Sequence, residues 1–255
     1  MMKKLQNIAA IFAAGALLLG AASCSHDGGA SLAALGKKDD GNKNPPPGGT
    51  TPATAATYSF AGGTNGIVAA DLDNWDLEEA NTIRSPVAST LKSVELNNGA
   101  TIAWKGSKVG TFRFRATHTA SSGDIATLAP TITGLNYNGG AASDLSSGIS
   151  IGDLDRYVSI DVDGAGTVTA KISFNNSSSN TGTLQAALVD SDGELLGDLV
   201  TADVATGKIT GTENKEGSVT GTTSSETTVY LVFSRNGAAG GGIDVTEIKV
   251  APAAE

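Results

Sequence analysis

Cysteine and histidine are almost absent from this chain. Its 255 residues include one cysteine and two histidines. A disulfide requires two cysteines, a zinc site several Cys or His ligands, and a Ser-His-Asp triad a histidine beside the nucleophile. The two histidines are His26, in a segment without hydrophobic periodicity, and His118, after a predicted strand. The composition therefore excludes a disulfide framework and disfavours zinc and triad chemistry.

Positive charge is also scarce. Asp and Glu number 26 against 17 for Lys and Arg, which gives a formal charge of −9. A chain this acidic repels phosphate backbones, so no nucleic acid is expected as a partner. Anionic polysaccharides are disfavoured as well, unless a local basic site or a bridging cation offsets the charge.

Long apolar runs are missing, apart from a short one near the start. Lys3 and Lys4 precede an apolar run from Ile8 to Leu19, and small residues follow it up to Cys24. This order is the plan of an export signal. A membrane-spanning helix requires roughly 20 apolar residues, more than this run contains. We therefore expect residues 1–23 to be a signal peptide.

The single cysteine lies at the expected cleavage point. Ala21-Ala22-Ser23-Cys24 resembles the lipobox of bacterial lipoproteins, with Ala21 where Leu is usual. The resemblance implies that the mature chain begins at Cys24 and carries acyl chains there. Several acyl chains, at ~0.8 kcal/mol per buried CH₂, anchor a protein stably. We therefore expect a cell-envelope protein held to a membrane by its lipid anchor, at the outer membrane or cell surface.

Residues 24–57 are expected to form a disordered tether. The segment is rich in Gly, Ser, Ala, Asn and Thr and contains Pro45-Pro46-Pro47-Gly48-Gly49. Such a composition does not bury enough apolar surface to fold. The folded domain is expected over residues 58–251.

In that domain, apolar and polar residues alternate with a period of two, which predicts half-buried strands. Runs of this kind begin at Phe112, Val158, Val168 and Val229. The run from Ile243 to Val250 changes phase, which predicts a β-bulge near Thr246-Glu247. The side chains expected to face the core are Val158, Ile160, Val168, Ile172, Phe174, Val229, Leu231 and Phe233.

Turns are frequent and helix is scarce. Asp163-Gly164-Ala165-Gly166 and Asp190-Ser191-Asp192-Gly193 each separate two strands and predict hairpin turns. One short helix is expected from about Asn74 to Ala80, with Asp73 or Asn74 as its N-cap. The predicted fold class is therefore all-β, a single antiparallel β-sandwich.

Several of these strands resemble a carbohydrate-binding-module-like jelly roll, the accessory domain of secreted bacterial polysaccharide lyases. The resemblance implies a jelly-roll, galactose-binding-like sandwich that binds sugars. Gly182, before Thr183-Leu184, stands where the module often has an Arg. The resembling pieces are Asn74-Trp75-Asp76-Leu77, Arg156-Tyr157-Val158-Ser159-Ile160-Asp161-Val162, Gly166-Thr167-Val168-Thr169, Thr228-Val229-Tyr230-Leu231-Val232 and Gly242-Ile243-Asp244-Val245-Thr246-Glu247-Ile248.

Sugar binding uses exposed rings and a few polar groups. Trp104, followed by Lys105-Gly106-Ser107-Lys108, is the ring expected to be most exposed, and Tyr137 is the next. Arg113 and Arg115 share one outward face of their predicted strand and offer N–H donors to hydroxyls or carboxylates. Each of these residues also fits a scattered surface position without a role. Trp75, Tyr157 and Tyr230 are further candidates. Because the domain has few aromatic residues, most of them are expected to lie in the core.

Two acidic segments begin like calcium loops. They are Asp71-Leu72-Asp73-Asn74-Trp75-Asp76 and Asp190-Ser191-Asp192-Gly193-Glu194, and neither has glycine at the sixth place of an EF-hand loop. A helix cap and a hairpin turn also explain them. A structural Ca²⁺ bound through oxygen atoms of several loops stays open, with Asp71, Asp73, Asp190 and Asp192 as candidate ligands.

Three classes of function follow. The first is a non-catalytic glycan-binding lipoprotein, the second a structural or adhesive surface lipoprotein without a sugar site, and the third an enzyme. Carboxylates are too abundant in an acidic chain for a nearby pair to indicate a glycosidase. Because no catalytic constellation is recognisable, we expect no enzyme, and the net charge favours a neutral glycan.

The lipid anchor can be tested by replacing the cysteine. Cys24→Ser is expected to leave the protein uncleaved or soluble, because no other segment is expected to hold it to a bilayer. Palmitate labelling with membrane fractionation measures both effects. Unchanged membrane retention of the variant would contradict the lipoprotein assignment.

Overall fold

The computed structural model describes residues 51–79, 81–106, 112–117, 124–138, 144–236 and 240–254. The predicted signal peptide, Cys24 and tether residues 25–50 lie outside these ranges, and so does His118. Residues 51–57, which the sequence places in the tether, are part of the folded unit: Ala53 is buried and a first strand begins at Ala56.

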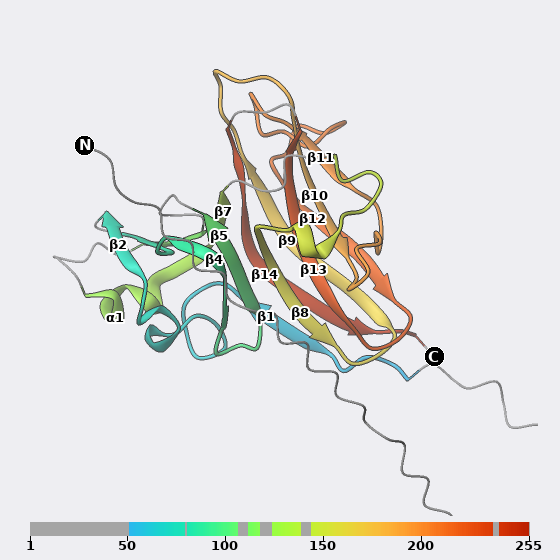
Figure 1. The fold of residues 1–255 in the computed structure, drawn as a ribbon, viewed down its shortest axis with the longest axis horizontal. Helices are drawn as coiled ribbons and strands as arrows, with labels where there is room; N and C mark the ends of the chain where they lie inside the picture. Colours follow the sequence, from blue (N-terminus) through green and yellow to red (C-terminus); the bar gives the residue numbers. More distant parts are fainter. Residues whose placement is uncertain are drawn as a thin grey trace, which may run out of the picture. The chain divides into compact units, whose positions relative to one another are not determined.

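The described residues form two antiparallel sheets, which confirms the predicted all-β sandwich (Figure 1). The eight-stranded sheet has the order β12-β9-β14-β7-β6-β3-β2, with β1 also paired to β14, and the six-stranded sheet has the order β11-β10-β13-β8-β5-β4. The strands are β1 (Ala56–Ser59), β2 (Asp76–Glu79), β3 (Thr82–Arg84), β4 (Ala88–Glu95), β5 (Thr101–Gly106), β6 (Phe112–Ala116), β7 (Ile132–Asn138), β8 (Arg156–Val162), β9 (Gly166–Asn175), β10 (Thr183–Val189), β11 (Val200–Asp203), β12 (Glu216–Thr223), β13 (Thr227–Asn236) and β14 (Gly242–Pro252). The short helices are η1 (Ala69–Leu72), α1 (Ile125–Leu128), η2 (Ala129–Thr131) and η3 (Ile151–Asp153).

The alternation in the sequence decides which faces meet in the core. All eight side chains predicted to face inward are buried in the main apolar cluster between the sheets. In β14 the register to β9 shifts between Val245 and Glu247, which confirms the predicted bulge. The bulge lets Ile243 and Val245 on one side of it and Ile248 and Val250 on the other all reach the core.

The two predicted hairpins have different outcomes. Asp190–Gly193 does turn the chain back, because Val189 and Leu195 form an antiparallel bridge and Gly193 N–H donates to Asp190 O. Asp163–Gly166 is not a hairpin: β8 belongs to the six-stranded sheet and β9 to the eight-stranded sheet. The chain therefore crosses from one sheet to the other between β8 and β9. A turn motif of a few neighbouring residues does not distinguish such a crossing from a hairpin.

The predicted helix from Asn74 to Ala80 is wrong. The 3₁₀ turn η1 precedes this stretch, and Asp76–Glu79 is strand β2, paired with β3. Trp75 is buried, with its ring centroid 5.6 Å from that of Trp104 and 5.1 Å from that of Phe114. Packing of this ring between strands outweighs the weak local preference for helix.

A second, smaller apolar cluster covers the outer face of the six-stranded sheet. Leu145 and Leu154 pack there on Ala187, Val189 and Val232. We call the stretch from Asp144 to Leu154 the covering segment. It is held by the buried Gln185, whose Oε1 accepts from Leu145 N–H at 3.1 Å and whose Nε2 donates to Asp144 Oδ1 at 2.9 Å. The side chain of Gln185 thus connects the sheet to the segment that covers it.

The first described residues are fastened to the β8–β9 connection. Ala165 N–H donates to Thr51 O and Ala53 N–H donates to Ala165 O. Asp163 accepts two hydrogen bonds from Thr54, at 2.7 Å from the backbone N–H and at 2.5 Å from the hydroxyl. These two bonds, the side-chain one first, lower the pKa of Asp163.

This attachment is expected to depend on pH. Because the folded-state pKa of Asp163 lies below its unfolded value of about 3.9, its contribution is fully present above that value and is lost as pH falls through the lowered pKa. Asp163→Asn should speed hydrogen exchange at the Thr54 amide at pH 7, and the Thr54 amide shift should follow the titration of Asp163 in the parent chain, as NMR measures. Asp192→Asn is the control, and unaltered exchange at Thr54 in Asp163→Asn would contradict the attachment.

Candidate functional site

Trp104 is part of the core, so the prediction that it is exposed is wrong. The side chain is 1% exposed, its ring lies 6.5 Å from that of Phe112, and its Nε1 donates to Pro86 O at 2.9 Å. The residues after Trp104 suggested a surface position, and Lys105 is indeed exposed. In a strand, however, an exposed residue is flanked by inward-facing ones, so a polar neighbour is no sign of exposure.

Tyr137 lies in β7, and its backbone is in register with Phe112 and Ile243. Its side chain lies outside what the structure describes, so its role as a binding platform stays a prediction.

Arg113 and Arg115 lie on the outward face of β6, as predicted. Phe112 and Phe114 are fully buried, whereas Arg113 is half-buried and Arg115 is exposed. Because side chains alternate along a strand, both arginines lie on the outer face of the eight-stranded sheet.

The register of that sheet aligns Arg113 with one polar residue on each of six other strands. Arg84 and Asn136 are its direct neighbours on β3 and β7, and Asp244 is next after Asn136. We call this alignment the polar row. Its members, in order across the sheet, are Asp76, Arg84, Arg113, Asn136, Asp244, Ser173 and Glu216.

The centre of the polar row is packed and its ends are open. Asn136 is 5% exposed, and its Nδ2 donates to Asp244 Oδ1 at 2.8 Å. Arg84, Arg113 and Ser173 are half-buried, while Asp76 and Glu216 are exposed. The row therefore combines guanidinium and amide donors with carboxylate, amide and hydroxyl acceptors.

Most of the polar row was not predicted from the sequence. The alternation Phe112-Arg113-Phe114-Arg115 is a clear local pattern. Arg84, Asn136 and Asp244 are polar positions in strands far apart in the chain, and only the register of the sheet brings them together. The one signal available was that each lies beside a buried apolar residue of its strand.

Two of the candidate calcium ligands, Asp71 and Asp190, have structural roles in turns. Asp71 accepts from Val68 N–H at 2.8 Å and from Asn97 N–H at 2.7 Å. Asp190 Oδ1 accepts from the N–H groups of Asp192 and Glu194. Asp73 and Asp192 are exposed. Within the described ranges, no group of three or more His, Cys, Asp or Glu side chains is placed to hold a metal ion.

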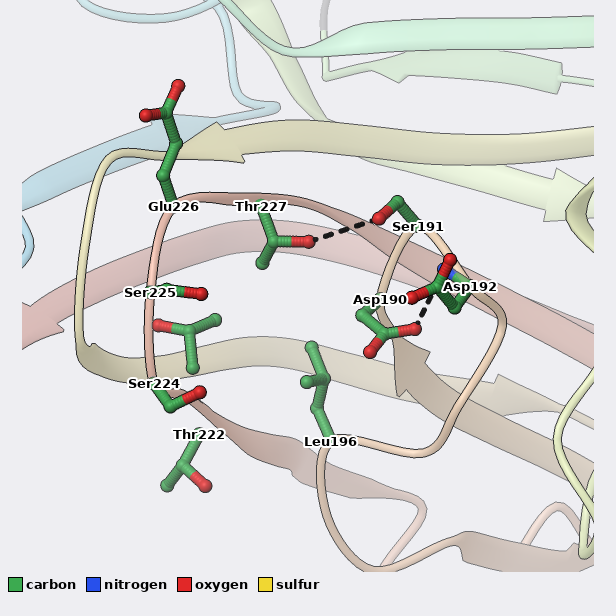
Figure 2. A pocket seen from close by; sticks show the side chains of 10 residues that line it. Asp190, Ser191, Asp192, Leu196, Thr222, Ser224, Ser225, Glu226 and Thr227 are labelled. Atoms are coloured by element: carbon green, nitrogen blue, oxygen red, sulfur yellow. Dashed lines mark hydrogen bonds between the residues drawn. The ribbon is translucent and has the colours of Figure 1, made fainter.

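A cleft of about 470 Å³ lies beside the Asp190–Gly193 turn, and Figure 2 shows the side chains that line it. Hydroxyls and carboxylates from this turn and from the β12–β13 connection line it, with the hydroxyls of Ser191 and Thr227 3.5 Å apart. Its described lining has three carboxylates, from Asp190, Asp192 and Glu226, and no basic side chain. Another cleft of about 410 Å³ is lined by uncharged side chains, Thr57, Ser59, Thr64, Asn65, Asn97 and Asn98.

The outer face of the six-stranded sheet carries a pair of half-buried tyrosines. The ring centroids of Tyr157 and Tyr230 are 5.0 Å apart at an interplanar angle of 80°. Burial, and then the charges of Tyr157 and Asp161, raise the pKa of Tyr230. These rings, rather than Trp104, are the partly exposed aromatic surface near the covering segment.

The burial of Trp104 has a measurable consequence. Trp104→Ala should destabilise the fold by about 3–5 kcal/mol, as truncation of a buried aromatic side chain does, because it opens a cavity beside Trp75 and Phe112. Urea unfolding measures the change in free energy, with the exposed Lys105→Ala as the control. An unchanged unfolding midpoint for Trp104→Ala would contradict the core position.

No protein-family model matches this chain, and no curated protein matches it. Several solved structures are distantly similar, among them these two. One is the isomalto-dextranase of Arthrobacter globiformis T6 complexed with panose, at 13% identity and a TM-score of 0.30, over 79% of this chain and 33% of that chain. The other is the CBM22-1 xylan-binding domain of Paenibacillus barcinonensis Xyn10C, at 14% identity and a TM-score of 0.30, over 67% of this chain and 100% of that domain. Similarity at this level does not identify a ligand for this chain. The chain spans about a third of the isomalto-dextranase.

Proposed function

We propose that this chain is a lipid-anchored, non-catalytic protein of the cell envelope that binds carbohydrate on the outer face of its eight-stranded sheet. The observation that carries the proposal is the polar row. In this row, arginine, amide, carboxylate and hydroxyl groups lie at paired positions across the sheet, from β2 at one edge to β12 at the other.

The chemistry of the polar row suits a neutral polyol. Every sugar hydroxyl is both a donor and an acceptor, so a surface that binds hydroxyls must offer both kinds of group. Arg84 and Arg113 supply donors, and Asp76, Asp244 and Glu216 supply acceptors of the opposite charge. Because the row contains two arginines and three carboxylates, it offers an anionic polymer no net positive charge, and a neutral ligand is favoured, as the net charge of −9 also suggests.

The position of the polar row is compatible with a tether. The chain enters the fold at the β8–β9 connection, where Ala165 contacts Thr51. Ser173 lies seven residues further along β9 than Gly166, or roughly 23 Å at ~3.3 Å per residue. A domain held from the β8–β9 connection would leave the polar row accessible.

The anchor and the absence of turnover are supported by the sequence. Cys24 follows an export signal and lies in a lipobox-like segment, which supports attachment through lipid at the outer membrane or cell surface. No helix in the described part of the chain has the length and apolar character of a membrane-crossing segment. Binding without turnover is proposed because the sequence contains no recognisable catalytic constellation.

One observation favours a second candidate, a structural or adhesive surface protein. Ser218, Thr220 and Thr222 are exposed along β12, and they face Lys171, Thr169 and Thr167 of β9. The Thr169 and Thr220 hydroxyls are 3.5 Å apart. A flat ladder made mostly of hydroxyls, without the guanidinium and carboxylate groups of the polar row, fits a contact surface between proteins.

The proposal is tested by a glycan array probed with the full chain. Parent protein should bind a neutral polysaccharide, and Arg113→Ala should weaken that binding roughly 10- to 150-fold, the equivalent of about 1.5–3 kcal/mol for a hydrogen bond to a charged group. Lys249→Ala, which removes an exposed cation from the same sheet face outside the polar row, is the matched control. Absence of glycan binding, or equal binding by both variants, would reject the glycan site and favour the adhesive function.

A further inference from the structure

We infer that the ligand of the polar row is a linear glycan chain that crosses the strands, with consecutive sugars facing consecutive strands. This inference rests on the proposed function and adds the shape, length and orientation of the ligand. It follows from the arrangement of the row, since a site for one sugar would gather its polar groups around a point, whereas here they lie in a line across the sheet.

The spacing of the polar row sets the length of the ligand. Neighbouring strands in a sheet lie ≈ 4.7–4.9 Å apart, so the six steps from β2 to β12 extend over roughly 29 Å. One sugar of an extended, equatorially linked polysaccharide advances the chain by a similar distance. Six steps join seven strands, so a chain of about seven sugars would lie over one side chain of the row at each strand.

The ends of the polar row favour an internal stretch of a polymer over a chain end. Asp76 lies on β2 and Glu216 on β12, the two outermost strands in the order of this sheet. Both residues are exposed, and no further strand of the described fold lies beyond either of them. A polymer is therefore able to continue past both edges of the sheet.

The burial of the row predicts unequal contributions along the ligand. Arg84, Arg113 and Asp244 are half-buried, and Arg113 and Asp244 are the direct neighbours of Asn136 in the row. Sugars above them therefore meet polar groups that are already fixed in place. Asp76 and Glu216 are exposed, and hydrogen bonds from mobile exposed side chains contribute less. Affinity should therefore depend first on the centre, and then rise in small steps as the chain reaches the edges.

Titration calorimetry with oligosaccharides of one to nine sugars tests this inference on the full chain. The probes are cello-oligosaccharides, xylo-oligosaccharides and a ladder made by partial hydrolysis of whichever polymer binds best on the array. Affinity should increase about two- to tenfold per added sugar, the equivalent of one net hydrogen bond, and should level off near seven sugars.

Variants at the edges separate this inference from the proposed function. Asp76→Ala and Glu216→Ala should each weaken binding of the seven-sugar probe by about two- to tenfold and leave the two-sugar probe unaffected. Thr220→Ala, an exposed β12 position outside the polar row, is the matched control and should alter neither. If short and long probes bind equally well, and Arg113→Ala still weakens binding as predicted above, the linear mode is wrong while glycan binding stands. If no probe and no array glycan binds, the proposed function itself is rejected.

Discussion

The long strand β14 determines the register on which both faces of the eight-stranded sheet depend. It pairs with β9 on one side, and with β7 and then β1 on the other. Its register to β9 shifts between Val245 and Glu247. Because a slip by one residue moves every side chain of a strand to the opposite face, the bulge lets Asp244 face outward while Ile248 and Val250 stay in the core.

The positions of the aromatic residues limit how the outer face of the sheet can bind a ligand. Trp75, Trp104, Phe112 and Phe114 are buried and in contact with one another through their rings, so they join the two sheets instead of lining a surface. A face without these rings has hydrogen bonds as its main source of binding energy. Each such bond has a small net value, because it replaces one to water, and useful affinity then requires many contacts along an extended ligand.

The strand pattern of this chain was predictable because it depends on neighbouring residues. The alternation in Phe112–Ala116 and Gly166–Asn175 identified the buried faces, and the change of phase in Gly242–Pro252 identified the bulge. The errors concern tertiary contacts. The stretch after Asp73 has local helix signals, yet Trp75 packs between strands, and Asp163–Gly166 has a hairpin motif, yet it joins strands of different sheets.

By itself, the sequence determined the all-β class, the alternation of the strands and the outward position of Arg113 and Arg115, because each follows from the chemistry of residues one or two positions apart. It also contains the segment at Cys24 that resembles a lipobox, on which the proposed lipid anchor rests. Only the tertiary structure decided that Trp104 is buried and that Arg84, Arg113, Asn136 and Asp244 lie side by side. The reason is that pairing between distant strands is set by the packing of the whole core, which no short segment of the chain encodes.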